Sequence, residues 1–301
     1  MRDIGFTARF TLVGLVGALM AWSVAAQAQE RQLFMSVTSP GGQPVAGVTA
    51  AQVQLDMESA ECSVTRVEPE VDKLKIALMV DSSGSVSNSI VSLRAGLKEF
   101  LDVLPPQHEV GLFTITGQTR RRVDFTTDRD ELRETAGRIF GEADPGVALI
   151  DGLRETWDRR FDDEDPWPMF VVVVYDGAER SNGTSDREFN EFAMELVSRG
   201  ATYHVIPVTT DGGSLQAQIS LNLSQNTGGI YNALATPTGL PKALTDLATT
   251  IGEHHDQVKD RYHVYFECDP VDAAAGITVL VTPSGGQSVQ LGLFADRRVE
   301  Q

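Results

Sequence analysis

A cluster of oxygen-bearing side chains follows an apolar segment in the first third of the chain. Residues 76–80, Ile-Ala-Leu-Met-Val, are typical of a buried strand and lead directly into Asp81, Ser83 and Ser85. Carboxylates and hydroxyls without sulfur or imidazole are ligands that suit Mg²⁺ or Mn²⁺. A serine-rich turn can instead cap the N-terminus of a following helix, a role open to Ser85 or Ser87.

A second carboxylate favours the metal interpretation. Residues 170–175, Phe-Val-Val-Val-Val-Tyr, end at Asp176, and Gly177 then allows the chain to turn sharply. Ligands of open α/β sheets bind beyond the carboxyl ends of the strands, so the two segments are expected to bring their polar ends together. The sequence therefore predicts a site for Mg²⁺ or Mn²⁺ made by Asp81, Ser83, Ser85 and Asp176.

The middle of the chain alternates apolar strand-like segments with amphipathic helices. This pattern predicts an α/β fold, a doubly wound and mostly parallel sheet with helices on both faces. The segment that begins with Arg120-Arg-Arg122 is charged enough to be an edge strand. The expected strands are 74–80, 110–115, 121–125, 169–175, 202–208 and 229–232.

Apolar residues recur at helical spacing between these strands, and we expect the resulting stripes to face the sheet. The stripes run over 90–104, 132–140, 150–161, 189–196 and 244–251. Ser185-Asp-Arg-Glu188 is a capping box that opens the fourth helix, Gly200 ends it, and Pro241 stands near the start of the last.

Both flanks of this region are rich in short strands separated by turns. The sequence thus predicts an N-terminal β-rich segment at 29–72, an α/β domain at 73–256 and a C-terminal β-rich segment at 257–301. Residues 1–28 are expected to be a signal peptide, with Arg2 and Arg9 before an apolar run and Ala26-Gln-Ala28 as the cleavage pattern. An uncleaved anchor is the alternative, but the apolar run 10–22 is shorter than the ~20 residues of a membrane span.

The chain is acidic, with 42 Asp and Glu against 25 Lys and Arg and a formal charge of −17. Removing residues 1–28 takes away two arginines and one aspartate, which gives −17 − 2 + 1 = −18. Such a surface repels nucleic acid and anionic lipid, and it favours cations or basic partners unless it serves solubility alone. The leader predicts an exported, periplasmic or extracellular protein. No apolar segment after it is long enough to span a membrane.

Two cysteines, Cys62 and Cys268, lie near opposite ends of the chain. Disulfides persist in exported proteins, so we expect them to pair, which requires the two flanks to meet. Two separate buried thiols are the alternative.

The segments Val80-Asp-Ser-Ser-Gly-Ser85 and Val174-Tyr-Asp-Gly177 resemble the von Willebrand factor type A (VWA) domain, over about residues 73–256. The resemblance implies a Rossmann-like fold and a metal-ion-dependent adhesion site, to which Asp81, Ser83, Ser85 and Asp176 correspond. The flanks, with residues 40–53 as a short β segment, look like those of exported bacterial proteins that carry such a domain.

One position departs from the family pattern. The family shows Gly-Gly-Thr-Ala-Leu, whereas this chain has Pro-Gly-Val-Ala-Leu at 145–149, so Val147 stands where a threonine ligand belongs. Asp151 lies on the same helical face, but the family has an aspartate there as well. A degenerate, metal-free site is therefore the main competing interpretation.

The resemblance implies binding of a protein partner, whose glutamate or aspartate would complete the metal coordination. No nucleophile elbow, zinc-protease motif or phosphate-binding glycine loop is present, so we expect no enzyme. The alternative function is a metal-independent structural or assembly component of the cell envelope. His204 is expected to be a core residue, His254-His255-Asp256 a solvated helix end, and 162–165 a solvated acidic loop.

Overall fold

The computed structural model describes most of the chain from residue 31 onward. The predicted signal peptide and Asp176 lie outside the described residues. The described ranges are 31–57, 61–69, 73–143, 146–162, 165, 167–175, 177–181, 185–208, 214–269, 277–283 and 287–294.

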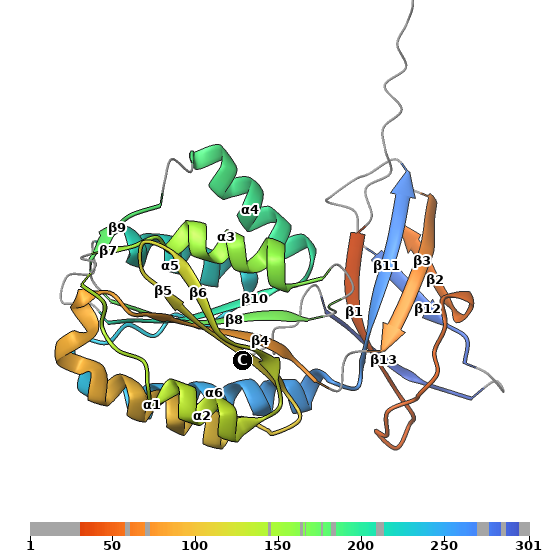
Figure 1. The fold of residues 1–301 in the computed structure, drawn as a ribbon. Coiled ribbons are helices and arrows are strands. Elements are labelled where there is room, and N and C mark those ends of the chain that lie inside the picture. The colour runs from red at the N-terminus through yellow and green to blue at the C-terminus, as the bar shows by residue number, and fades with distance from the viewer. Residues whose placement is uncertain are drawn as a thin grey trace, which may run out of the picture.

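A five-stranded sheet with the order β10-β8-β4-β5-β6 forms the centre of the molecule (Figure 1). Four strands are parallel, and β6 pairs with β5 in the antiparallel sense at one edge. This confirms the predicted mostly parallel sheet with the arginine-rich strand at its edge. The strands are β4 (Lys75–Asp81), β5 (Glu109–Ile115), β6 (Thr119–Thr126), β8 (Pro168–Tyr175) and β10 (Thr202–Val208).

Three helices cover each face of this sheet (Figure 1). One face carries α1 (Ile90–Val103), α2 (Arg129–Ala136) and α6 (Leu240–Val258), and the other carries α3 (Leu149–Arg160), α4 (Asp186–Ser198) and α5 (Leu215–Thr227). Each set packs its apolar stripe against one side of the strands, so the central strands are buried on both sides and read as continuous apolar runs.

One local prediction is wrong, and one helix was not predicted. Residues 229–232 do not form a strand, because Tyr231 and Leu234 make only isolated bridges to β10 before a 3₁₀ turn, Pro237–Gly239, begins. Hydrophobic periodicity does not predict α5, since this helix buries Gln216 and Ser220.

The predicted stripe 132–140 is longer than the helix it belongs to. Helix α2 ends at Ala136, and Phe140 beyond it is 53% exposed instead of facing the sheet.

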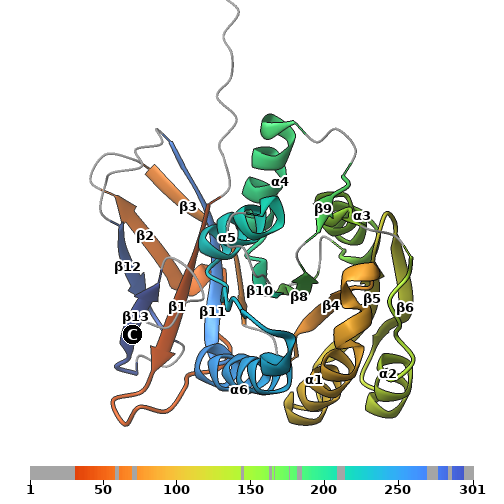
Figure 2. The ribbon, with the colours of Figure 1, turned by 90° about the vertical axis from the view of Figure 1, so that its left-hand side faces the viewer.

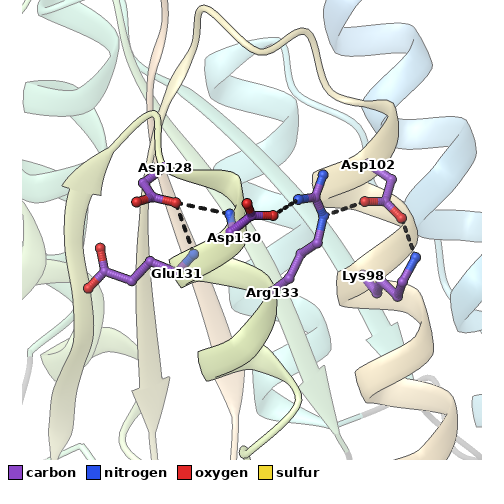
Figure 3. A network of polar contacts seen from close by, with 6 residues as sticks. All are labelled: Lys98, Asp102, Asp128, Asp130, Glu131 and Arg133. Carbon is purple, nitrogen blue, oxygen red and sulfur yellow. Dashed lines mark hydrogen bonds and ion pairs between the residues drawn. The ribbon is translucent and has the colours of Figure 1, made fainter.

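Ion pairs link α2 to α1 on the surface (Figure 3). Arg133 lies between Asp130 on its own helix and Asp102 on α1, and Lys98 contacts Asp102 from the other side.

The two flanks combine into one β unit beside the central sheet (Figure 2). A four-stranded sheet has the order β13-β1-β11-β3, and a two-stranded sheet pairs β12 with β2. Their facing side chains form a third core of their own. The strands are β1 (Arg31–Thr38), β2 (Val53–Met57), β3 (Glu61–Pro69), β11 (Arg261–Asp269), β12 (Ile277–Val281) and β13 (Gln290–Phe294), and a 3₁₀ turn, Ala50–Gln52, precedes β2.

A disulfide joins Cys62 on β3 to Cys268 on β11, as predicted. The two residues are direct partners across this antiparallel pair, with Cα atoms 4.1 Å apart. The bond therefore ties the N-terminal flank to the C-terminal flank. Within the described part of the chain, no helix is both long enough and apolar enough to cross a membrane.

Candidate metal site

Asp81 is the last residue of β4, and it is buried, with only 1% of its surface exposed. The backbone amide of Ser83 donates to its Oδ1 at 2.7 Å. The amide of Tyr175, at the end of β8, donates to its Oδ2 at 3.0 Å. The carboxylate therefore links the carboxyl ends of two neighbouring parallel strands.

Two serine hydroxyls beside this carboxylate are also buried. Ser82 and Ser83 are each 1% exposed. The Ser82 Oγ has no hydrogen-bond partner among the described residues, and the Ser83 Oγ lies close enough to the Asp81 carboxylate to favour its charged form without meeting the geometry of a hydrogen bond. Buried hydroxyls normally have a partner, and an unsatisfied group in a native structure points to a water, an ion or a functional site. Their position fits the prediction that oxygen atoms gather at this edge.

Burial raises the pKa of the Asp81 carboxyl to about 6. The amide of Ser83, its hydroxyl and the amide of Tyr175 favour the charged form and limit the rise. A buried carboxylate with few compensating donors would gain from a nearby cation.

The other two predicted ligands, Ser85 and Asp176, are not shown beside the Asp81 carboxylate. Ser85 lies in the 3₁₀ turn Gly84–Ser89 and is exposed, on the segment that leads into α1. Asp176 is outside the described residues, but Tyr175, which directly precedes it, contacts Asp81 through its backbone. The structure thus brings Asp81 and Ser83 together and leaves the contribution of Ser85 and Asp176 as a prediction.

Val147 lies in the two-residue strand β7 (Gly146–Val147), which pairs with β9 (Ala178–Glu179). Its side chain is fully buried in the apolar core between the sheet and α3, α4 and α5. The position where the resemblance predicts a threonine ligand therefore contributes to the apolar core.

The N-terminus of α3 is capped by residues from the loop after β8. Oε1 of Glu179 accepts hydrogen bonds from the amide of Leu149 at 3.0 Å and from the amide of Ser181 at 3.1 Å. The Ser181 hydroxyl in turn accepts from the amide of Asp151 at 3.1 Å. These contacts fix the 146–151 segment against the segment that follows Asp176, although the sequence showed no capping signal there.

An ion pair lies next to the candidate site. The amide of Glu142 donates to the carbonyl of Ser82 at 2.7 Å, and its carboxylate pairs with Arg120 on β6 at 3.0 Å. Gly141 packs so closely that an added Cβ would lie 2.4 Å from the Ser87 hydroxyl. The 141–142 backbone is thereby held against the 82–87 turn.

The histidine predictions are confirmed in one case and wrong in another. His204 is a core residue, 3% exposed, and its Nδ1 accepts from the amide of Ile230 at 3.1 Å. His255 is not part of a solvated helix end, because it is 1% exposed and its ring packs edge-on against the His108 ring, with 4.7 Å between the ring centroids.

Among the described residues, no group of three or more His, Cys, Asp or Glu could hold a metal.

A solved structure described as von Willebrand factor type A from Catenulispora acidiphila matches this fold with a TM-score of 0.51. The match covers 91% of this chain and 77% of that chain at 11% sequence identity. The chain has the von Willebrand factor type A fold. At 11% identity, the similarity between this chain and that structure concerns the fold alone.

Two further solved structures with VWA features score below this match. The vWF domain of the type V pili tip protein Mfa5 from Porphyromonas gingivalis has a TM-score of 0.47 at 14% identity, over 61% of this chain and 96% of that one. Proximal thread matrix protein 1 from the mussel byssus, with a zinc-occupied MIDAS motif, has a TM-score of 0.48 at 14% identity, over 73% and 50%. No family model and no curated protein matches the chain.

Proposed function

We propose that this VWA-fold protein is an exported binding protein that recognises a protein partner through a divalent-cation site. The cation is Mg²⁺ or Mn²⁺, and the proposed ligands are Asp81, Ser83, Ser85 and Asp176. The observation that carries this proposal is the buried Asp81 carboxylate beside two buried hydroxyls that lack full hydrogen bonds. A cation would neutralise the carboxylate and satisfy hydroxyl oxygens at once.

The donor set suits recognition. Two carboxylates offset the charge of a divalent ion, and serine hydroxyls bind it without adding charge. A cation bound there would offer an open position to an outside oxygen, which a glutamate or aspartate of the partner would fill. The proposal includes no chemical step, because no activated nucleophile is part of the described site.

The second candidate is a metal-independent structural or assembly component of the cell envelope with a degenerate site. It is favoured by Val147, whose side chain belongs to the apolar core and offers no oxygen. The two candidates differ in one measurable property, since only the first makes partner binding depend on a cation.

The proposed organisation has a signal peptide at 1–28, a β-rich segment at 29–72, the VWA domain at 73–256 and a second β-rich segment at 257–301. A periplasmic or extracellular location is supported by the Cys62–Cys268 disulfide, since such bonds persist in oxidising compartments. The acidic surface makes nucleic acid an unsuitable partner.

Calorimetric titration of the mature chain with MnCl₂ tests the site. We expect saturable binding, lost in Asp81→Ala and weakened about tenfold or more in Ser83→Ala, the scale seen for groups that orient or bind a metal. Asp130→Ala, which removes an exposed carboxylate on α2, is the matched control and should bind as the wild type does. Absence of binding by the wild type, or equal binding by both site variants, would overturn the proposal.

A further inference from the structure

The four-stranded sheet of the β unit ends in an uncovered strand. β13 is the last strand in the order β13-β1-β11-β3, and no other described strand pairs with its outer edge. Two of its apolar side chains are exposed, Leu291 by 37% and Leu293 by 44%. An edge of this kind presents free backbone amides and carbonyls together with apolar surface.

The exposed leucines belong to the core face of the sheet. Leu293 is the direct partner of Met35 on β1, and Leu291 is the direct partner of Val37. Directly opposed residues of an antiparallel pair point to the same face. Met35 and Val37 are almost completely buried, at 0% and 1% exposure, so the covering of this face ends between β1 and β13.

The other edges of the four-stranded and five-stranded sheets carry features that prevent strand pairing. The edge strand β6 carries Arg120, Arg121 and Arg122, and β3 carries Glu61, Arg66 and Glu68. The outer side of β10 is bridged by Tyr231 and Leu234. Charges and covering segments are the usual means of protecting an edge.

β13 has none of these protections within the described residues 287–294, whose sequence Gln-Ser-Val-Gln-Leu-Gly-Leu-Phe contains no charge and no proline. The absence of charge on this edge also allows a second copy of the acidic chain to approach it. Two copies of a chain with a formal charge of −17 repel each other over most of their surface. Paired strands lie about 4.8 Å apart, and an uncharged edge permits that approach without opposing like charges.

We propose that two copies of the protein associate by antiparallel pairing of their β13 strands, which joins the two four-stranded sheets. Pairing centred on Gly292 is self-complementary. It places Leu291 of each copy opposite Leu293 of the other, so the exposed leucines cover one another. A two-fold contact of this kind uses the same patch on both copies.

The proposed contact is separate from the candidate metal site. Figure 1 shows β13 at one end of the molecule, whereas β7 and β9 lie at the far end of the central sheet. The contact therefore does not depend on the proposed cation, and a dimer would carry two such sites. Two linked sites bind a multivalent partner more tightly than either alone.

Analytical ultracentrifugation of the mature chain in chelator, over a concentration series, tests the proposal. We expect a monomer–dimer equilibrium for the wild type and a dissociation constant at least about tenfold higher for Leu293→Lys, the change that a loss of ~1.4 kcal/mol produces. Leu280→Lys is the matched control, because Leu280 on β12 is 55% exposed and is not in β13. It should dimerise as the wild type does.

Amide hydrogen exchange locates the contact independently of charge. Exchange of the amides of 290–294 should slow as the concentration rises, while exchange on the opposite edge strand β3 should not change. Leu291→Thr keeps a strand-forming residue and should also weaken the dimer. A wild type that stays monomeric, a dimer that withstands Leu293→Lys, or a dimer without slowed exchange at β13 would each overturn the proposal.

Discussion

Val147 stands where the resemblance predicts a threonine ligand, and the structure buries its side chain in the apolar core. Valine and threonine have nearly the same shape, but only threonine offers an oxygen. Here the side chain is fully buried with apolar neighbours such as Leu149 and Leu153. A hydroxyl at this position would lie in the core, away from water.

We therefore expect Val147→Thr to reduce the stability of the chelated protein by about 1–3 kcal/mol, the cost of burying a hydroxyl without a partner. Affinity for Mg²⁺ should not rise, because the side chain belongs to the core. Urea unfolding in chelator, together with calorimetric titration, measures both quantities. Tighter Mg²⁺ binding by the variant would show that this loop can turn its side chain toward the site.

For single residues, the sequence predicted the location of those that directly follow an apolar strand. It did not predict the burial of residues that are enclosed by contacts distant in the sequence. Asp81 lies at the end of the predicted buried strand, and the amide of Ser83 contacts its carboxylate, because the end of a buried parallel strand fixes the place of the residues that follow it. The burial of the Ser82 hydroxyl was not predicted, because the pattern of apolar and polar residues around it does not indicate burial. The burial of His255 depends on its contact with His108, far away in the sequence.

Capping contacts between distant segments position the α3 helix. No local side chain caps its N-terminus, and Glu179 from β9 fills that role. We expect Glu179→Ala to cost about 1–2 kcal/mol of stability, because the amides of Leu149 and Ser181 lose their acceptor. Thermal or urea unfolding checks this value.

Glu179→Gln is the matched variant, because its amide oxygen can still accept from the same donors. It should retain more stability than Glu179→Ala. Equal losses in the two variants would mean that the negative charge, and not the capping contact, is what stabilises the start of the helix.

Element prediction succeeded where periodicity was strong and failed where polar residues are buried. The capping box at Ser185 and Glu188 begins α4 as expected. In contrast, α5 buries Gln216 and Ser220 and exposes Leu215 and Leu221, so its sequence does not show an amphipathic pattern. Segment 229–232 has strand-like residues but makes only isolated bridges to β10.

At the scale of the molecule, the β unit could not be derived from either flank alone. Strands from 31–69 pair with strands from 261–294 in both sheets of the unit and share one core with them. The expected pairing of Cys62 with Cys268 was the only sequence feature that suggested the flanks meet. Contacts between segments about 200 residues apart leave no local pattern. The α/β core was predictable because its central strands are continuous apolar runs and most of the described helices between them, α5 excepted, have a clear apolar periodicity.

Buried histidines should make the whole molecule sensitive to acid. His108 is fully buried, and its Nδ1 accepts the amide of Leu74 at 3.1 Å, so the ring is neutral with its proton on Nε2. Burial, followed by the charges of His255 and Arg129, lowers its pKa to about 4. A lowered pKa in the folded state gives stability that is present above the unfolded value of about 6.5 and is lost as the pH falls toward 4.

We expect His108 to account for a loss of up to about 3 kcal/mol over that window, from the difference between the folded and unfolded pKa values. Urea unfolding at several pH values between 7.5 and 4.5 measures the slope. His108→Leu should flatten the pH dependence whatever its effect on stability at pH 7.5. Parallel profiles for the variant and the wild type would assign the acid sensitivity to other groups.

The most direct test of the central claim is the melting temperature of the protein without residues 1–28, measured with Mg²⁺ and with chelator. A ligand at 100 times its dissociation constant adds about 2.7 kcal/mol, so a site built on Asp81 should raise the melting temperature of the wild type and leave that of Asp81→Ala unchanged. Superimposable melting curves of the wild type in Mg²⁺ and in chelator would contradict the cation site.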